Sequence, residues 1–120
     1  MPGERLEARS LNFAEGAEAA AAGLLDRRDP PDAIVCASDT LALGAYRAAR
    51  ATRPTDGAAL PAVVGFDATP VAAALGLASV AQPIRQAAHT CLDLLLPRLA
   101  GENPAAQGVL LLPTLALPDP

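Results

Sequence analysis

The stretch Pro61-Ala62-Val63-Val64-Gly65-Phe66-Asp67 constrains the fold more than any other part of the chain. Its small and β-branched apolar residues predict a short strand that is buried on both faces, as inside a parallel sheet. Gly65 is expected to end the run and let the backbone turn sharply, which places Asp67 just beyond the strand. A similar run at 33–37 is followed by Ser38-Asp39. Because ligands bind at the carboxyl ends of parallel strands in open α/β sheets, the two segments predict one polar ligand site.

Helical and strand-like patterns alternate along the 120 residues, with no internal repeat and no low-complexity linker. This order predicts a single α/β domain over residues 1–120, with a parallel sheet flanked by helices. Gly44 in the middle of a helix costs roughly 1 kcal/mol relative to alanine, which indicates a close approach by another backbone. Asn12 is expected to cap the first helix. We expect helices over 13–25, 40–50, 69–76 and 84–99, and strands over 33–37, 63–66, 77–81 and 109–117.

Charge and residue types exclude several classes of function. The formal charge of −4 argues against nucleic-acid binding by this chain alone, and the absence of lysine removes Schiff-base and P-loop chemistry. One histidine and two separated cysteines do not make a metal site. Cys36 and Cys91 are interpreted as buried thiols of a reducing compartment, with a disulfide as the less favoured alternative. No secretion signal or membrane-length apolar run is present, so a soluble, cytoplasmic chain is expected.

Four segments occur in an order that is more specific than a general α/β pattern. They are Pro-Asp-Ala-Ile-Val-Cys-Ala-Ser-Asp-Thr-Leu-Ala-Leu-Gly-Ala (31–45), Val-Val-Gly-Phe-Asp (63–67), Ser-Val-Ala-Gln-Pro (79–83) and Leu-Leu-Pro-Thr-Leu (111–115). Together they resemble the carboxyl-terminal part of the effector-binding core of the lactose/galactose-repressor (LacI/GalR) family of transcriptional regulators. The resemblance extends from about residue 12 to the end of the chain.

The resemblance implies a type 1 periplasmic-binding-protein fold, in which a ligand lies between two α/β subdomains. Asp67 matches the aspartate that accepts hydrogen bonds from effector hydroxyls, and Ser38 matches a polar cleft residue. Asp39 matches a helix-capping aspartate, and Gln82 lies at a strand that crosses the hinge. Ligand binding is therefore expected at Asp67, Ser38, Asp39 and Gln82, without a cofactor, a metal or a catalytic residue. The resemblance also implies a homodimer, with an interface here formed by Leu41, Ala45, Ala48, Val71 and Leu75.

The chain departs from the family pattern in ways that limit the resemblance. Ala68 replaces a common second acidic residue, residues 76–79 replace proline-leucine-threonine-threonine, and Pro118 replaces a usual arginine. DNA-binding helices and most of the first subdomain are absent, so DNA contact is expected only through a domain outside this chain. In the family, the helix matching 84–99 packs on that first subdomain. Its apolar stripe must therefore find another partner, for which we expect a second copy of the chain.

Simpler interpretations stand beside these expectations. Asp67 could be only a turn residue, Asp39 and Ser38 could be only helix caps, and His89 is expected to be a solvated surface residue. The alternative function is a small Mg²⁺-dependent phosphoryl-transfer enzyme or receiver-like domain, with Asp39 and Asp67 as ligands of the ion. A transport-binding protein would share the fold and is disfavoured because no signal peptide is recognised.

Overall fold

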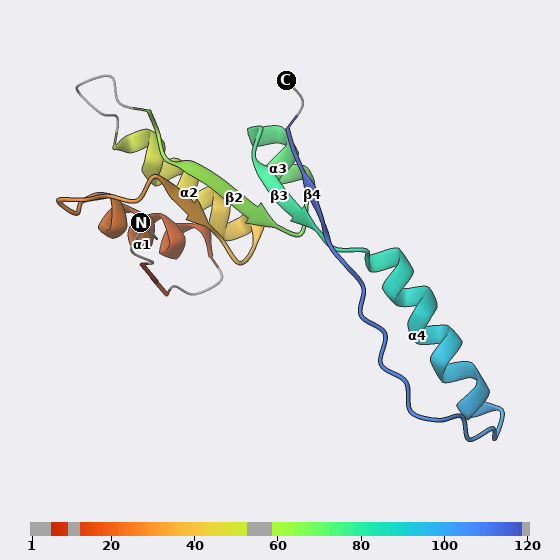
Figure 1. Ribbon diagram of the computed structural model, residues 1–120. Helices are drawn as coiled ribbons and strands as arrows, with labels where there is room; N and C mark the ends of the chain where they lie inside the picture. Colours follow the sequence, from red (N-terminus) through yellow and green to blue (C-terminus); the bar gives the residue numbers. More distant parts are fainter. Residues whose placement is uncertain (1–5, 10–12, 53–58, 119–120) are drawn as a thin grey trace.

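The computed structural model describes residues 6–9, 13–52 and 59–118, which contain four helices and four strands in alternating order (Figure 1). This alternation confirms the expected α/β class. Asn12, the expected cap of α1, lies outside the described residues, and Phe13 occupies the N-cap position without a side-chain hydrogen bond. The elements are α1 (Ala14–Leu25), β1 (Ala33–Val35), α2 (Asp39–Ala51), β2 (Ala62–Phe66), α3 (Pro70–Leu75), β3 (Ala78–Ala81), α4 (Ile84–Leu99) and β4 (Thr114–Ala116).

The four strands form one sheet in the order β1-β2-β3-β4. Strands β1, β2 and β3 are parallel, so the expected parallel pairing of the two Asp-terminated strands is confirmed. Strand β4 runs antiparallel to β3, and the predicted strand 109–117 is wrong in its extent because only Thr114–Ala116 pairs. The segment 109–112 instead belongs to the stretch that runs from the end of α4 back toward the sheet, and Pro113 lacks the N–H that a continuing ladder requires (Figure 1).

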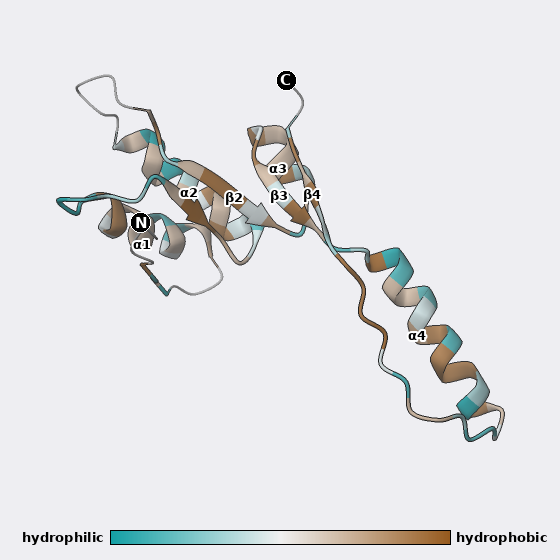
Figure 2. Cartoon of the chain, in the orientation of Figure 1, coloured by the Kyte–Doolittle hydropathy of each residue, from teal (hydrophilic) through white to brown (hydrophobic). Residues whose placement is uncertain are grey.

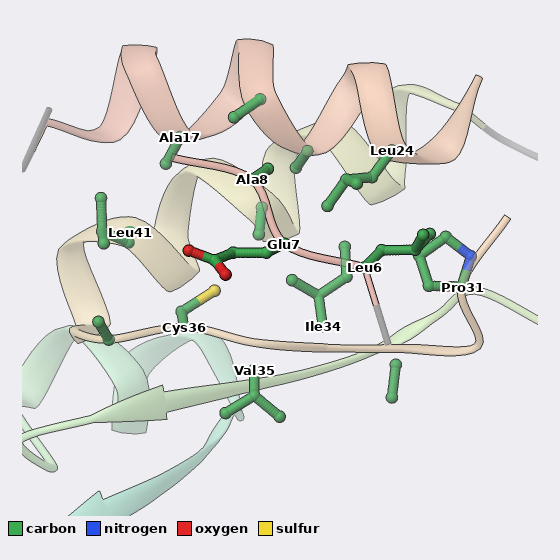
Figure 3. A pocket seen from close by; sticks show the side chains of 15 residues that line it. Leu6, Glu7, Ala8, Ala17, Leu24, Pro31, Ile34, Val35, Cys36 and Leu41 are labelled. Carbon is green, nitrogen blue, oxygen red and sulfur yellow. The ribbon is translucent and has the colours of Figure 1, made fainter. Parts of the chain in front are cut away.

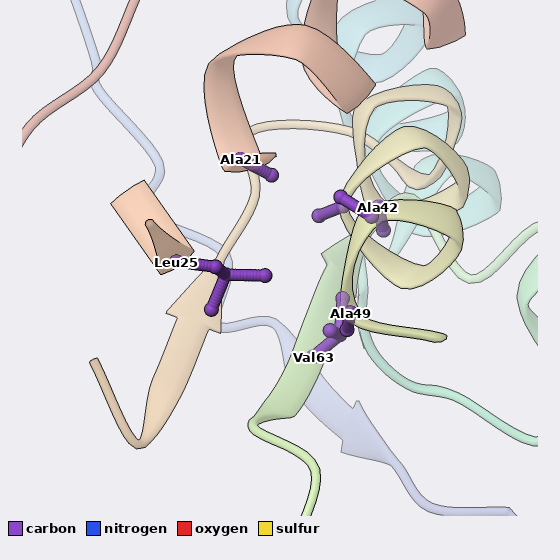
Figure 4. Close-up of a cluster of buried hydrophobic side chains, with 7 residues drawn as sticks. Ala21, Leu25, Ala42, Ala49 and Val63 are labelled. Atoms are coloured by element: carbon purple, nitrogen blue, oxygen red, sulfur yellow. The ribbon is translucent and has the colours of Figure 1, made fainter. Parts of the chain in front are cut away.

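The core lies between α1, α2 and the sheet, and it is built mostly from alanine. Ala21, Leu25, Ala42, Ala49 and Val63 are among the buried side chains of this cluster (Figure 4). Such small side chains let α1 and α2 approach closely. A Cβ atom on Gly44 would collide with the Ala14 carbonyl oxygen and lie 2.8 Å from the Ala17 Cβ atom, which confirms the close approach expected at Gly44.

Burial of β2 alternates along the strand. Val63 and Gly65 are buried against α2, whereas Val64 and Phe66 are half-buried. On the neighbouring strand, Val35 has 77% of its surface exposed. The prediction of a strand buried on both faces is therefore wrong, because α1 and α2 pack on one face of the sheet only.

Helix α4 projects away from the rest of the chain, together with the segment that follows it (Figure 1). None of its residues is buried, and Figure 2 shows several strongly hydrophobic positions along its ribbon, among them the exposed leucines. The radius of gyration is 19.0 Å, whereas a compact chain of this length would have about 14 Å. Within the described residues, the prediction that this apolar stripe lacks an intrachain partner is therefore confirmed.

Exposure along α4 bears on two further expectations. His89 is exposed, as expected for a surface residue. Cys91 is also exposed, so its expected burial is wrong, and the reason is that α4 projects away from the packed part of the chain (Figure 1). Cys36 is half-buried, and both thiols are free. In the described part of the chain, no helix combines the length and the apolar character needed to cross a membrane.

Candidate ligand-binding site

Asp67 and Gln82 lie together at the carboxyl ends of β2 and β3. The amide Nε2 of Gln82 donates a hydrogen bond of 2.8 Å to Asp67 Oδ1, and both residues are exposed. Since a carboxylate only accepts hydrogen bonds, this contact uses the NH₂ group of Gln82. The amide oxygen of Gln82 is not part of the contact and can accept another hydrogen bond. The pair therefore presents oxygen acceptors to the solvent at this edge of the sheet.

The turn after β2 has an uncommon backbone. Asp67 and Ala68 have φ angles of 100° and 50°, in the left-handed region that residues other than glycine rarely adopt. Gly65 was expected to provide the turn, and this is wrong because Gly65 lies within β2. Its lack of a side chain serves another purpose, since a Cβ atom there would collide with Asp39 Oδ1.

Asp39 lies beneath this turn and not on the exposed edge. It has 2% of its surface exposed. Its Oδ1 accepts a 2.6 Å hydrogen bond from the Ser79 hydroxyl, and its Oδ2 accepts from the Thr69 N–H at 2.6 Å and the Thr69 hydroxyl at 2.8 Å. Both oxygens are thus occupied by donors of the chain itself. The expected contact between Asp39 and a ligand is therefore wrong, because the carboxylate is buried and satisfied.

Two opposing effects act on the Asp39 carboxyl group. Burial by itself would raise its pKa. Hydrogen bonds from the Ser79 hydroxyl, the Thr69 N–H and hydroxyl, and the Phe66 backbone stabilise the ionised form and hold the pKa below its ordinary value. Asp39 is consequently a carboxylate at neutral pH and serves as a fixed acceptor inside the fold.

Ser79 and Thr69 surround Asp39 with hydrogen bonds, and the sequence analysis did not single them out. Ser79 has 1% of its surface exposed. A hydroxyl within an otherwise apolar strand was the available signal, since a buried hydroxyl needs a hydrogen-bond partner. Its partner Asp39 is separated from it by 40 residues, which no local pattern could reveal.

Ser38 is the N-cap of α2. Its Oγ accepts a hydrogen bond of 3.2 Å from the Leu41 N–H, and the residue is half-buried. Of the two roles expected for Ser38, the structure thus shows the helix cap. Structural roles therefore account for both Ser38 and Asp39, while Asp67 and Gln82 present the exposed polar groups of the predicted set.

The residues expected at a dimer interface are divided between the core and the surface. Ala45 and Ala48 each have 2% of their surface exposed and belong to the core, so their assignment to a dimer surface is wrong. The physical reason is that α1 covers this side of α2. Leu41 and Leu75 are half-buried, whereas Val71 of α3 is 44% exposed.

A cavity of about 520 Å³ opens between α1 and β1 (Figure 3). Ile34 and Cys36 point from the strand toward α1, and Leu6 and Glu7 cross above them. Among the described residues that line it, Glu7 and Cys36 provide the only polar side chains, and burial raises the pKa of the Cys36 thiol. None of the four predicted ligand-binding residues lines this cavity.

The arrangement of strands and turn is that of a known protein family. Residues 2–117 match the family of periplasmic binding protein-like domains. The chain belongs to this family. The expected resemblance to the effector-binding core of LacI/GalR-family regulators is thereby confirmed, and so is the predicted fold class.

Regulators of transcription are similar to this periplasmic binding protein-like domain. HTH-type transcriptional regulator MalR of Streptomyces coelicolor is 38% identical over 103 residues, which are 82% of this chain and 28% of MalR. A regulatory protein of the LacI family from Chloroflexus aggregans is 34% identical, with a TM-score of 0.77 over 89% of this chain and 39% of that structure. The chain thus spans well under half the length of these proteins.

Two similar structures contain a disaccharide. The complex of the transcriptional regulator CelR with cellobiose is 33% identical, with a TM-score of 0.71 over 88% of this chain and 32% of that one. A LacI-family regulator from Arthrobacter in complex with lactose is 29% identical, with a TM-score of 0.65 over 82% of this chain and 37% of that one.

Proposed function

We propose that this chain is the effector-sensing portion of a transcriptional regulator and binds a sugar- or nucleoside-like ligand at Asp67. The observation that carries the proposal is the exposed Asp67–Gln82 pair, in which Asp67 Oδ1 accepts from Gln82 and leaves Oδ2 available. Hydroxyl groups of a neutral ligand would donate to Oδ2 and to the amide oxygen of Gln82. Such charge-assisted hydrogen bonds are worth more than neutral ones.

The rest of the cleft and the DNA-binding part are proposed to belong to regulator sequence beyond these 120 residues. MalR, which is similar to this chain, has more than three times the length matched here. The net charge of −4 supports assigning DNA contact to another domain. Ligand would act by favouring a closed cleft over an open one, because it contacts both walls only in the closed form. A regulator of this kind would act in the cytoplasm.

A second copy of the chain is the proposed partner in assembly. The exposed leucines of α4 and the exposed Val71 of α3 support an apolar surface for such a contact. The Mg²⁺-dependent alternative is not favoured, because both oxygens of Asp39 are already hydrogen-bonded within the chain. Asp67 would then have to hold the ion without the second predicted ligand.

Melting curves and calorimetric titration test the proposed function. Cellobiose, lactose and adenosine are titrated separately against the chain, and MgCl₂ serves as the alternative ligand. At least one organic ligand should raise the melting temperature, and Asp67→Asn should weaken its binding roughly tenfold or more, because a charged acceptor is lost. Asparagine is chosen because it tolerates a positive φ angle.

The matched control is Asp93→Asn, which changes an exposed aspartate on α4. It should leave binding unchanged. Stabilisation by Mg²⁺ alone, or equal losses in the Asp67 and Asp93 variants, would contradict the proposed site.

A further inference from the structure

Three consecutive backbone N–H groups follow β2, and each donates a hydrogen bond to a different acceptor. The Asp67 N–H donates to the Val80 carbonyl at 2.8 Å, which extends the pairing of β2 with β3. The Ala68 N–H donates to Ser79 Oγ at 2.9 Å, and the Thr69 N–H donates to Asp39 Oδ2 at 2.6 Å. One backbone carbonyl and two side chains thus accept the hydrogen bonds of the turn.

The two side-chain partners are joined to each other. The Ser79 hydroxyl accepts from Ala68 and donates to Asp39 Oδ1 at 2.6 Å, so one hydroxyl group links the turn to the carboxylate. Both side chains are at least 98% buried. In the described residues no buried side-chain polar atom lacks a hydrogen-bond partner. Neither Ser79 nor Asp39 can therefore move without leaving a donor or acceptor unpaired in the interior.

This network acts on the two residues that have left-handed backbone angles. Asp67 and Ala68 are not glycines, so their φ angles of 100° and 50° persist only if the surroundings impose them. The N–H groups of Ala68 and Thr69 are the two that the network binds. The direction of the Asp67 side chain follows from the same backbone angles, because φ fixes where the Cα–Cβ bond points.

Resting on the proposed function, we propose that Ser79 and Asp39 are positioning residues that hold Asp67 in the backbone conformation that presents its carboxylate to the ligand. Neither residue reaches the ligand in this arrangement. Asp67 contacts the ligand, and the buried pair determines the direction in which the Asp67 carboxylate points. Loss of either member would let the turn relax toward an extended backbone and turn the carboxylate away from Gln82.

The experiment measures the backbone of the turn in the isotope-labelled 120-residue chain by NMR, without any ligand. The coupling between the amide proton and Hα reports φ at Asp67 and at Ala68, and hydrogen exchange reports the protection of the Ala68 N–H. In Ser79→Ala and Asp39→Asn, both couplings should move toward extended values and protection of Ala68 should fall. Ser79→Thr keeps the hydroxyl group and should retain the parental couplings.

Thr52→Ala is the control for a general loss of stability. Its hydroxyl donates to the Ala48 carbonyl at 2.7 Å, at the opposite end of α2 from Asp39. This variant should melt earlier with unchanged couplings at 67 and 68. If Ser79→Ala and Asp39→Asn do not fold, Thr69→Val removes one hydrogen bond to Asp39 and should produce a smaller change in the same direction. Parental couplings in every folded network variant would overturn the inference.

Titration with cellobiose and lactose separates the two proposals. If either sugar binds, Ser79→Ala should weaken it roughly tenfold through the displaced Asp67, and Ser79→Thr should restore binding. Altered couplings together with no binding of cellobiose, lactose or adenosine would contradict the proposed function and leave the network's control of the turn supported. Sugar binding that is unaffected by an altered turn would overturn the positioning role.

Discussion

A single buried carboxylate, that of Asp39, connects α2, the turn after β2 and β3. A charge in the interior is costly unless its hydrogen-bonding capacity is filled. Here Ser79 and Thr69 fill it, and the space next to the carboxylate is available because residue 65 has no side chain. The charged group is therefore a structural element of the site, although the ligand is proposed to meet Asp67.

Stability should depend on pH through Asp39, and the direction follows from its lowered pKa. In the unfolded chain the pKa of an aspartate is about 3.9. In the folded chain Asp39 stays ionised to lower pH. The stabilisation from this group is present in full above the unfolded-state value. It is lost as the pH falls through the unfolded and then the folded pKa.

Urea unfolding of the parent and of Asp39→Asn, from neutral pH to about pH 3, measures this effect. At neutral pH the variant should be less stable by about 2–4 kcal/mol, because buried donors lose a charged acceptor. The difference should shrink as the pH falls. Asp93→Asn should change stability by less than about 0.5 kcal/mol throughout. A gap between parent and Asp39→Asn that grows in acid would contradict the assignment.

At the scale of elements, the crossing of α1 and α2 determines how the core is built. The helices meet at Gly44, against the backbone of α1 at Ala14 and Glu18. Alanines on both helices keep the separation short. Across the same contact, Arg47 and Glu18 approach to 3.6 Å, but this exposed ion pair contributes little. Close backbone packing therefore stabilises this pair of helices more than charge does.

Two glycine-to-alanine changes test this packing. Gly44→Ala should destabilise the chain by about 1–3 kcal/mol, because the new methyl group meets α1 backbone that cannot move aside. Gly23→Ala, within α1, meets nothing within 4 Å, and should stabilise it by about 0.5–1 kcal/mol through higher helix propensity. Chemical denaturation measures both. Equal effects of the two substitutions on stability would show that α1 and α2 are not closely packed at Gly44.

The sequence predicted the elements that depend on local pattern and missed those that depend on distant contacts. Apolar periodicity located the helices and the parallel strands, and a glycine in mid-helix indicated the α1–α2 approach. Gly65 was misinterpreted because its neighbour Asp39 lies 26 residues earlier in the chain. Asp67 was placed at the correct edge by strand order alone, but its contact with Gln82 depends on the register of β2 and β3.

At the scale of the whole molecule, the chain divides into a packed α/β part and a projecting arm formed by α4 and the segment after it. The longest dimension is 66 Å, against 30 and 29 Å for the others. Leu92, Leu95 and Leu99 of the arm are exposed. Several exposed leucines on one helix favour an interaction site.

Association through the arm is tested by sedimentation at several protein concentrations. The parent chain should form dimers as concentration rises, because burial of leucine side chains favours association. The double variant Leu92→Gln/Leu95→Gln should shift toward monomer, whereas Arg85→Ala, an exposed change on the same helix, should not. A parent chain that stays monomeric and binds no hydrophobic dye would contradict the proposed self-association.

The contact between residue 65 and Asp39 has a consequence for how this sequence can vary. Any side chain at position 65 would occupy the volume of the Asp39 carboxylate. Substitutions at the two positions are therefore coupled. A library that randomises both codons should return glycine together with aspartate among stable clones. Larger residues at 65 should occur in stable clones only together with a shorter side chain at 39. Such clones would lose the hydrogen bonds between Asp39 and the turn that contains Asp67.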